Sequence, residues 1–189
     1  QCHCTCCRHG KPRQRRETAD AYDQGIRFVK NMPYADGDAS IFILNSQYNP
    51  DADRGILAYD LNKNKEIWRF TCGSQVTTVD FRDIDGDSLE EIILGTYAPS
   101  NGILKNGTRD DRSYIFALDD NGALLWQKTM GPAFSGAYAC IGEFGKLGPM
   151  ICVLEKFRAG EDAHDNVRLL EPLTGTTAIN AQFFGKDIP

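Results

Sequence analysis

Three segments of the chain share one pattern, and this internal repeat constrains the fold more than any other feature. Each segment reads as an apolar strand, a short polar turn and a second strand; the segments are residues 56–70, 114–128 and 167–181. Their turns hold residues typical of β-hairpins, namely Asn62–Asn64, Asn121-Gly122 and Thr174-Gly175. The sequence therefore predicts three copies of one hairpin.

One bulky residue occupies the same place in each copy. Trp68 and Trp126 take it in the first two hairpins, and Ile179 takes it in the third. We expect the two tryptophans to pack at equivalent positions between neighbouring sheets, because large aromatic side chains contribute much of the buried apolar area of a core.

A further strand pair precedes each hairpin. The apolar runs are short, rich in β-branched and aromatic residues, and bounded by Gly, Pro, Asn or Asp, which favours strands over helices. In the first copy, strands are expected at 25–31 and 40–46, separated by the loop 32–39. The chain is thus predicted to be all-β, with three four-stranded antiparallel units at about 24–71, 75–130 and 136–184.

These repeats resemble known propeller repeats. "YDLNKNKEIW" and "LDDNGALLW" are similar to the outer hairpin of quinoprotein-type blades, and "DFRDIDGDSLEEIILG" resembles the calcium loop of FG-GAP repeats in integrin-type propellers. The resemblance covers about residues 24–184 and implies three propeller-type blades. Since closed propellers have about 4–8 blades, it implies a partial or open β-propeller.

The acidic loop is the strongest candidate site. Asp83, Asp85 and Asp87 alternate, so three carboxylates can converge on one centre, with the Leu89 carbonyl and Glu91 completing the set. Oxygen ligands at this spacing suit Ca²⁺, although Glu91 stands where the resembled family usually has Asp. The other interpretation is a solvated acidic turn that is capped by its own backbone amides.

The corresponding loops of the other two units lack this ligand set. The first keeps Asp36 and Asp38, and the third keeps only Glu143. A single calcium site in the second unit is therefore predicted, with a structural role.

Seven cysteines form the second group of candidates. Four of them stand at the start of the chain: Cys2, Cys4, Cys6 and Cys7. Disulfides are the favoured interpretation for these four, and a soft-metal cluster with His3 and His9 is the other one. Cys72 is a candidate partner for one of them.

Cys140 and Cys152 flank a predicted turn centred near Lys146-Leu147, which places them opposite each other on paired strands. They are predicted to form a disulfide or, in the other interpretation, to be two small buried hydrophobic residues.

Residues 1–22 are predicted to form an extended N-terminal arm ahead of a domain at 23–189. The segment 8–16 holds five basic residues and no acidic one, whereas the whole chain has a formal net charge of −5. A basic arm on an acidic body indicates docking on protein. Nucleic acid binding and a solvated, disordered tail are the weaker interpretations.

Asn106 heads an N-glycosylation sequon in the longest predicted loop, 98–112. Together with the cysteines, the calcium loop and a first residue that is Gln1, the sequon favours an extracellular protein that carries an N-linked glycan. No apolar run approaches the ~20 residues of a membrane span.

The sequence lacks the common catalytic motifs, and two of its three histidines, His3 and His9, fall in the arm while His164 falls in a polar loop. We therefore expect a secreted, non-enzymatic structural module that self-assembles into a fibre-like array through the arm and exposed blade flanks, stabilised by Ca²⁺ and disulfides. A fragment of a calcium-binding adhesion or ligand-recognition propeller is the alternative. A quinoprotein enzyme fragment is a third, disfavoured because three blades cannot enclose a central cofactor.

Overall fold

The structure is a computed structural model that describes residues 24–34, 37–46, 51–157 and 164–184. These residues form an all-β protein with one short 3₁₀ helix, η1 (Gly145–Leu147). The strands are β1 (Gln24–Tyr34), β2 (Gly37–Ser46), β3 (Arg54–Asp60), β4 (Lys65–Thr71), β5 (Gln75–Arg82), β6 (Glu91–Tyr97), β7 (Leu104–Lys105), β8 (Thr108–Arg109), β9 (Tyr114–Leu118), β10 (Leu124–Thr129), β11 (Ser135–Glu143), β12 (Pro149–Phe157), β13 (His164–Leu170) and β14 (Thr177–Phe184).

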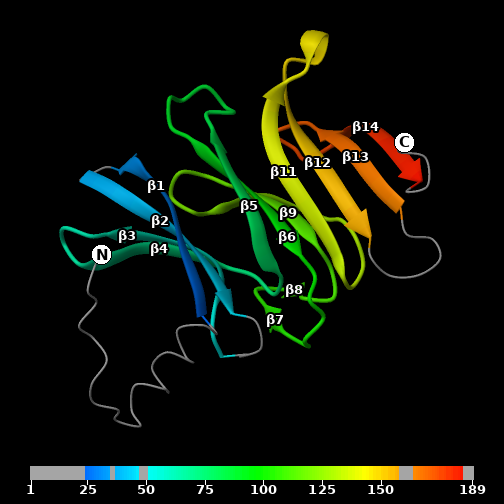
Figure 1. The fold of residues 1–189 in the computed structure, drawn as a ribbon. Helices are drawn as coiled ribbons and strands as arrows, with labels where there is room; N and C mark the ends of the chain where they lie inside the picture. Colours follow the sequence, from blue (N-terminus) through cyan, green and yellow to red (C-terminus); the bar gives the residue numbers. More distant parts are fainter. Residues whose placement is uncertain (1–23, 35–36, 47–50, 158–163, 185–189) are drawn as a thin grey trace, which may run out of the picture.

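The strands pair antiparallel in a four-stranded sheet, an eight-stranded sheet that divides into two four-stranded units, and a two-stranded hairpin (Figure 1). The first unit is the four-stranded sheet β1-β2-β3-β4. The second unit is β5-β6-β9-β10, and the third is β11-β12-β13-β14. A bridge between Gly136 and Tyr97 joins the second and third units into one curled eight-stranded sheet. The short β7-β8 hairpin stands apart from both sheets.

The three predicted hairpins are confirmed, and they share one irregularity. In each, one residue of the outer strand is left out of the pairing just before the bulky residue: Ile67, Leu125 and Ala178. Beyond this bulge Trp68 pairs with Ala58, Trp126 pairs with Ala117, and Ile179 pairs with Leu169. A bulge in the same register in all three hairpins makes the units equivalent residue by residue.

Each tryptophan lies on the turn of the next hairpin. The residue four places before the bulky one has a positive φ in every turn: Asn64 at 50°, Gly122 at 76° and Gly175 at 65°. A methyl group at Gly122 would lie 2.4 Å from Cε3 of Trp68, and one at Gly175 would lie 2.7 Å from Cε3 of Trp126. The expected packing of both tryptophans between neighbouring units is therefore confirmed. Glycine is favoured at Gly122 and Gly175 for two reasons: the positive φ, and the absence of a Cβ that would meet the indole ring.

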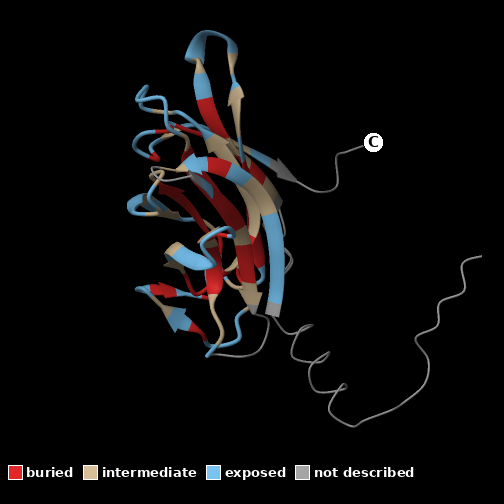
Figure 2. Ribbon diagram, turned by 90° about the vertical axis from the view of Figure 1, so that its left-hand side faces the viewer, coloured by how far each residue is buried: buried red, intermediate tan, exposed pale blue. Residues whose placement is uncertain are grey.

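Two apolar cores lie between the units, because successive side chains of β6 and β9 point to opposite faces of the sheet. Leu94 and Phe116 face the first unit, whereas Ile93, Ile115 and Ala117 face the third. All five are fully buried. The second unit is thus covered on both faces, and Figure 2 shows burial concentrated in the middle of the strands while their connections are exposed.

The loop predicted at 32–39 is wrong. β1 continues to Tyr34 and β2 begins at Gly37, with Met32 paired to Ala39. Both of these side chains are buried, so they continue the apolar face of the strand pair.

The predicted arm, with Cys2, Cys4, Cys6 and Cys7, lies outside the described residues, as does Asp36. Within the described part of the chain, no helix has the length and apolar character that crossing a membrane requires.

Candidate metal centre

The acidic loop between β5 and β6 is held by its own carboxylates. Asp83 accepts hydrogen bonds from the backbone N–H groups of Gly86 at 2.7 Å and Ser88 at 3.0 Å. Asp85 and Asp87 each accept one from the residue two places on, at 3.1 and 2.8 Å. Positive φ angles at Gly86 and Ser88, 87° and 74°, complete the tight turn.

Three of the five predicted ligands come together. One carboxylate oxygen each of Asp83, Asp85 and Glu91 lie within 4.8 Å of one another. The first two side chains are exposed, and Glu91 is only 3% exposed at the start of β6. Asp87 is not part of this group, and the backbone N–H of Leu89 donates to the Asp87 carboxylate. The tight turn brings Asp83 and Asp85 beside Glu91 at the start of β6.

The acidic side chains in and beside the loop repel one another. Burial raises the pKa of Glu91, and the charges of Asp85 and Asp87 raise it further against the hydrogen bond from Ile84 N–H at 2.7 Å. Burial also raises the pKa of Asp120 in the β9–β10 turn, and the charges of Asp119 and Asp87 raise it further. A cation between Asp83, Asp85 and Glu91 would relieve this repulsion.

The end of the loop is tied to the first unit. Glu90 forms an ion pair with Lys30 of β1, and the Lys30 Nζ lies 4.5 Å from the centroid of the Phe81 ring. The position of the acidic loop is therefore coupled to the contact between the first two units.

A scan of protein-family models finds none that matches this chain, and a search of curated proteins finds no similar one.

Asn106 lies in the two-residue turn of the β7-β8 hairpin. Its φ of 47° and that of Gly107, 72°, are those of a tight type I′ turn. The side chain is exposed, yet its Nδ2 donates to the backbone oxygen of Thr71 at 3.0 Å and to its hydroxyl at 2.7 Å. Nδ2 is the atom that a glycan takes, so glycosylation would leave one hydrogen for these two bonds. Occupancy of the sequon stays a prediction.

Cys140 and Cys152 face each other across β11 and β12, as the sequence predicts. Both are free thiols in the structure, and burial together with the neighbouring Cys140 raises the pKa of Cys152. The placement makes a disulfide geometrically accessible, and its formation stays a prediction.

Cys72 is fully buried, and its thiol donates to the Ser74 oxygen at 3.3 Å. Burial raises the pKa of Cys72 to about 12, so the thiol is almost entirely protonated and unreactive at neutral pH. Its predicted pairing with an arm cysteine would require this buried thiol to become accessible.

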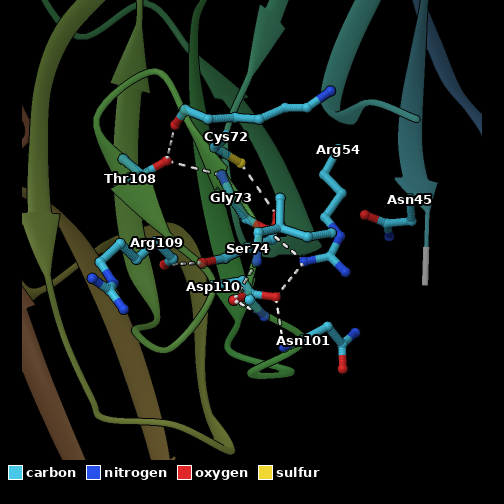
Figure 3. Close-up of polar contacts among 12 residues, drawn as sticks. Asn45, Arg54, Cys72, Gly73, Ser74, Asn101, Thr108, Arg109 and Asp110 are labelled. Atoms are coloured by element: carbon cyan, nitrogen blue, oxygen red, sulfur yellow. Dashed lines mark hydrogen bonds and ion pairs between the residues drawn. The ribbon is translucent and has the colours of Figure 1, made fainter. Parts of the chain in front are cut away.

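A buried ion pair that the sequence does not reveal organises the same region (Figure 3). The Arg54 Nη1 donates to the Gly73 oxygen at 2.6 Å and to Asp110 at 3.1 Å. The Asp110 carboxylate also accepts three backbone N–H bonds, from Asn101, Gly102 and Ile103. Arg54 and Asp110 are 0% and 2% exposed. This network fastens the 98–113 connection of the second unit to β3, and every group in it has a structural partner.

Proposed function

We propose that the chain is a non-enzymatic structural module of three propeller-type blades, and that copies of it associate through the sheet faces at the two ends of the array. The second unit supports this best. Its sheet is buried on both faces, whereas within the described residues the first and third units are each covered by a neighbouring unit on one face. Apolar side chains on an uncovered sheet face are stabilised when a second sheet packs on them.

The apolar character of the first unit supports association of these faces. Ile26 and Phe28, on the side of β1–β2 away from the second unit, are 61% and 53% exposed. Contiguous apolar patches, rather than single exposed residues, mark contact surfaces, and these two side chains lie side by side on one strand. The proposal assigns no reaction to the chain.

Calcium at Asp83, Asp85 and Glu91 would stiffen the loop beside the first junction. We predict that added Ca²⁺ raises the melting temperature of the native chain and that a chelator reverses the rise, because the metal binds the folded loop alone. Asp85→Ala should abolish the response, while Asp38→Ala, on the first unit, should keep it. A melting temperature that ignores both calcium and chelator would remove the metal from the account.

An extracellular setting agrees with three features of the chain. Weak calcium sites fill where the free ion is abundant, as it is outside the cell. The Asn106 side chain is exposed for modification, and Cys140 and Cys152 are placed for an oxidised bridge. We propose N-glycosylation at Asn106 and oxidation of this cysteine pair as features of the secreted form.

Sedimentation velocity on the full chain tests the proposed association. We expect species larger than the 21.0 kDa monomer, whose share grows with protein concentration. One 21.0 kDa species at all concentrations would contradict association and would favour a module completed by further blades of a longer chain.

A further inference from the structure

The first unit carries a continuous apolar face on the side away from the second unit. Ile26 pairs with Leu44, Phe28 pairs with Phe42, and Phe42 pairs with Leu57, so these five residues point to one side. The Phe28 and Phe42 rings pack edge to face at 5.7 Å. A groove of about 310 Å³ on this side is lined by Ile26, Leu44 and Leu57 together with Asn45, Asp51, Ala52, Asp53 and Arg69, so charged groups flank the apolar row. Leu44 is buried, and Ile26 and Phe28 are the most exposed of the five apolar side chains. These five residues are named the head face.

The same row is covered in each of the other units. The pairing Phe28–Phe42–Leu57 of the first unit corresponds in register to Val79–Leu94–Phe116 of the second. Leu94 and Phe116 are fully buried beneath the first unit, and Val79 packs in the same core. In the third unit the row includes Ala139 and Val153, which are buried beneath the second. Within the chain, the row that corresponds to the head face is thus covered by the preceding unit in both the second and the third units.

The covering side is equally regular. Ile41 and Ala58 of the first unit pack on the second, and Ile93 and Ala117 of the second pack on the third. By register, the corresponding pair of the third unit is Cys152 with Leu169. This side of the third unit, named the tail face, consists of Tyr138, Cys140, Cys152, Leu154, Val167 and Leu169.

The residues of the first and second units that correspond in register to Cys140 both contact the next unit. Cys140 pairs with Cys152 as Lys30 pairs with Ile41 and Asp80 with Ile93. Lys30 reaches Glu90 of the next unit, and Asp80 accepts the backbone N–H of Ile141 in the next unit at 2.7 Å. Cys140, which is exposed, holds this contact position on the third unit.

We propose that the tail face of one molecule packs on the head face of a second copy, in the arrangement that joins the units within the chain. This inference rests on the proposed function and adds to it which faces meet: the contact is head to tail, and so it repeats without closing on itself as a pair. A second copy is the occupant because the chain already contains this contact twice.

The turns make this contact weaker than the two inside the chain. In place of tryptophan on glycine, it brings Ile179 to Asn64, whose side chain accepts a hydrogen bond from Tyr59 at 2.9 Å. A Cβ at the corresponding glycines comes within 2.4–2.7 Å of the tryptophan ring, so Asn64 excludes that packing. Copies therefore associate through the faces alone, and reversibly.

A mixing experiment on the full chain tests the polarity. Phe28→Asp disables the head face and Leu154→Asp disables the tail face, so each variant alone should stay monomeric. Mixed together, they should form a dimer and nothing larger, because one intact face remains on each. Dimer formation also shows that both variants fold. The control Leu104→Asp, at an exposed leucine of β7 on neither face, should assemble like the unmodified chain.

A second experiment strengthens the contact. The double variant Asn64→Gly with Ile179→Trp restores the tryptophan-on-glycine pair between copies, and it should lower the concentration of half-assembly by about ten-fold or more. Either single variant should change it little, since the other half of the pair is missing.

The outcomes separate this inference from the proposed function. If the unmodified chain assembles but the mixed variants give no dimer, or the double variant assembles as the unmodified chain does, the head-to-tail contact is wrong and association itself stands. If the unmodified chain never exceeds its monomer mass, both are overturned.

Discussion

The two junctions inside the molecule are built from the same positions and filled in different ways. Between the first and second units the space holds large rings: Phe116 meets Phe70 at 5.1 Å and stacks with Tyr114 at 5.5 Å. Between the second and third units the facing residues include Ala117, Ala137 and Ala139. The first junction contains aromatic rings, whereas the second is built from aliphatic side chains and alanines, with a close backbone approach at one point.

The close approach at the second junction is visible at Gly95. A methyl group there would lie 2.4 Å from the Ala137 oxygen. The hydroxyl of Thr78 accepts the Ala139 N–H at 2.9 Å, so side chains of β5 satisfy the edge of β11. Residue size on the facing rows therefore sets how near two equivalent sheets come, while the tryptophan on the glycine of the next turn stays the same at both.

The largest effect is expected at the ring-filled junction. Phe116→Ala should lower the free energy of unfolding by about 3–5 kcal/mol, because it removes a fully buried ring and leaves a cavity. Ile115→Val, on the opposite face of the same strand, should cost about 0.5–1.5 kcal/mol. Urea denaturation measures both. A cost of Phe116→Ala no larger than that of Ile115→Val would show that the Phe116 ring does not fill the first junction.

The close-approach junction should instead be sensitive to added volume. Gly95→Ala should cost about 1–3 kcal/mol, because the new methyl group meets backbone that cannot turn away. Gly142→Ala is the matched control on β11, where the nearest atom belongs to the Phe144 ring at 3.1 Å, which can rotate. A tolerated Gly95→Ala would mean that the second and third units stand further apart.

The ion pairs at the rims should contribute least. Lys30–Glu90 spans the first junction and Arg82–Glu143 spans the second. Lys30→Met should cost about 0.2–1 kcal/mol, diminishing as salt is added. Arg82→Met should cost less, because its pair is more exposed and lacks the ring contact that Lys30 has with Phe81. The reverse order would contradict the closer coupling assigned to the first junction.

Hairpins were predictable because their signals are local. Turn residues such as Asn121-Gly122 and the alternation beside them lie within a few positions of one another, and so does the bulky residue that repeats at Trp68 and Trp126. The opposition of Cys140 and Cys152 also follows from a single short turn. Local pattern sufficed for these elements.

Contacts between distant segments were not predictable in the same way. Arg54 and Asp110 stand in unremarkable polar stretches, and nothing near either residue points to the other. In the acidic loop, spacing correctly placed Asp83, Asp85 and Glu91 together, but it did not separate Asp87. The charge of Asp87 also acts on Asp120 in the β9–β10 turn, which the sequence places far from the loop.

The tryptophan-on-glycine contact repeats at both junctions, and a double-mutant cycle on Trp68 and Gly122 measures it. Gly122→Ala should be costly in the unmodified chain, since the methyl group strains the positive φ and also meets the indole. In the Trp68→Ala background only the backbone strain remains. We predict a coupling free energy of about 1–3 kcal/mol between the two sites, measured by urea denaturation of the four proteins. Costs that add to within about 0.3–0.5 kcal/mol would contradict the contact.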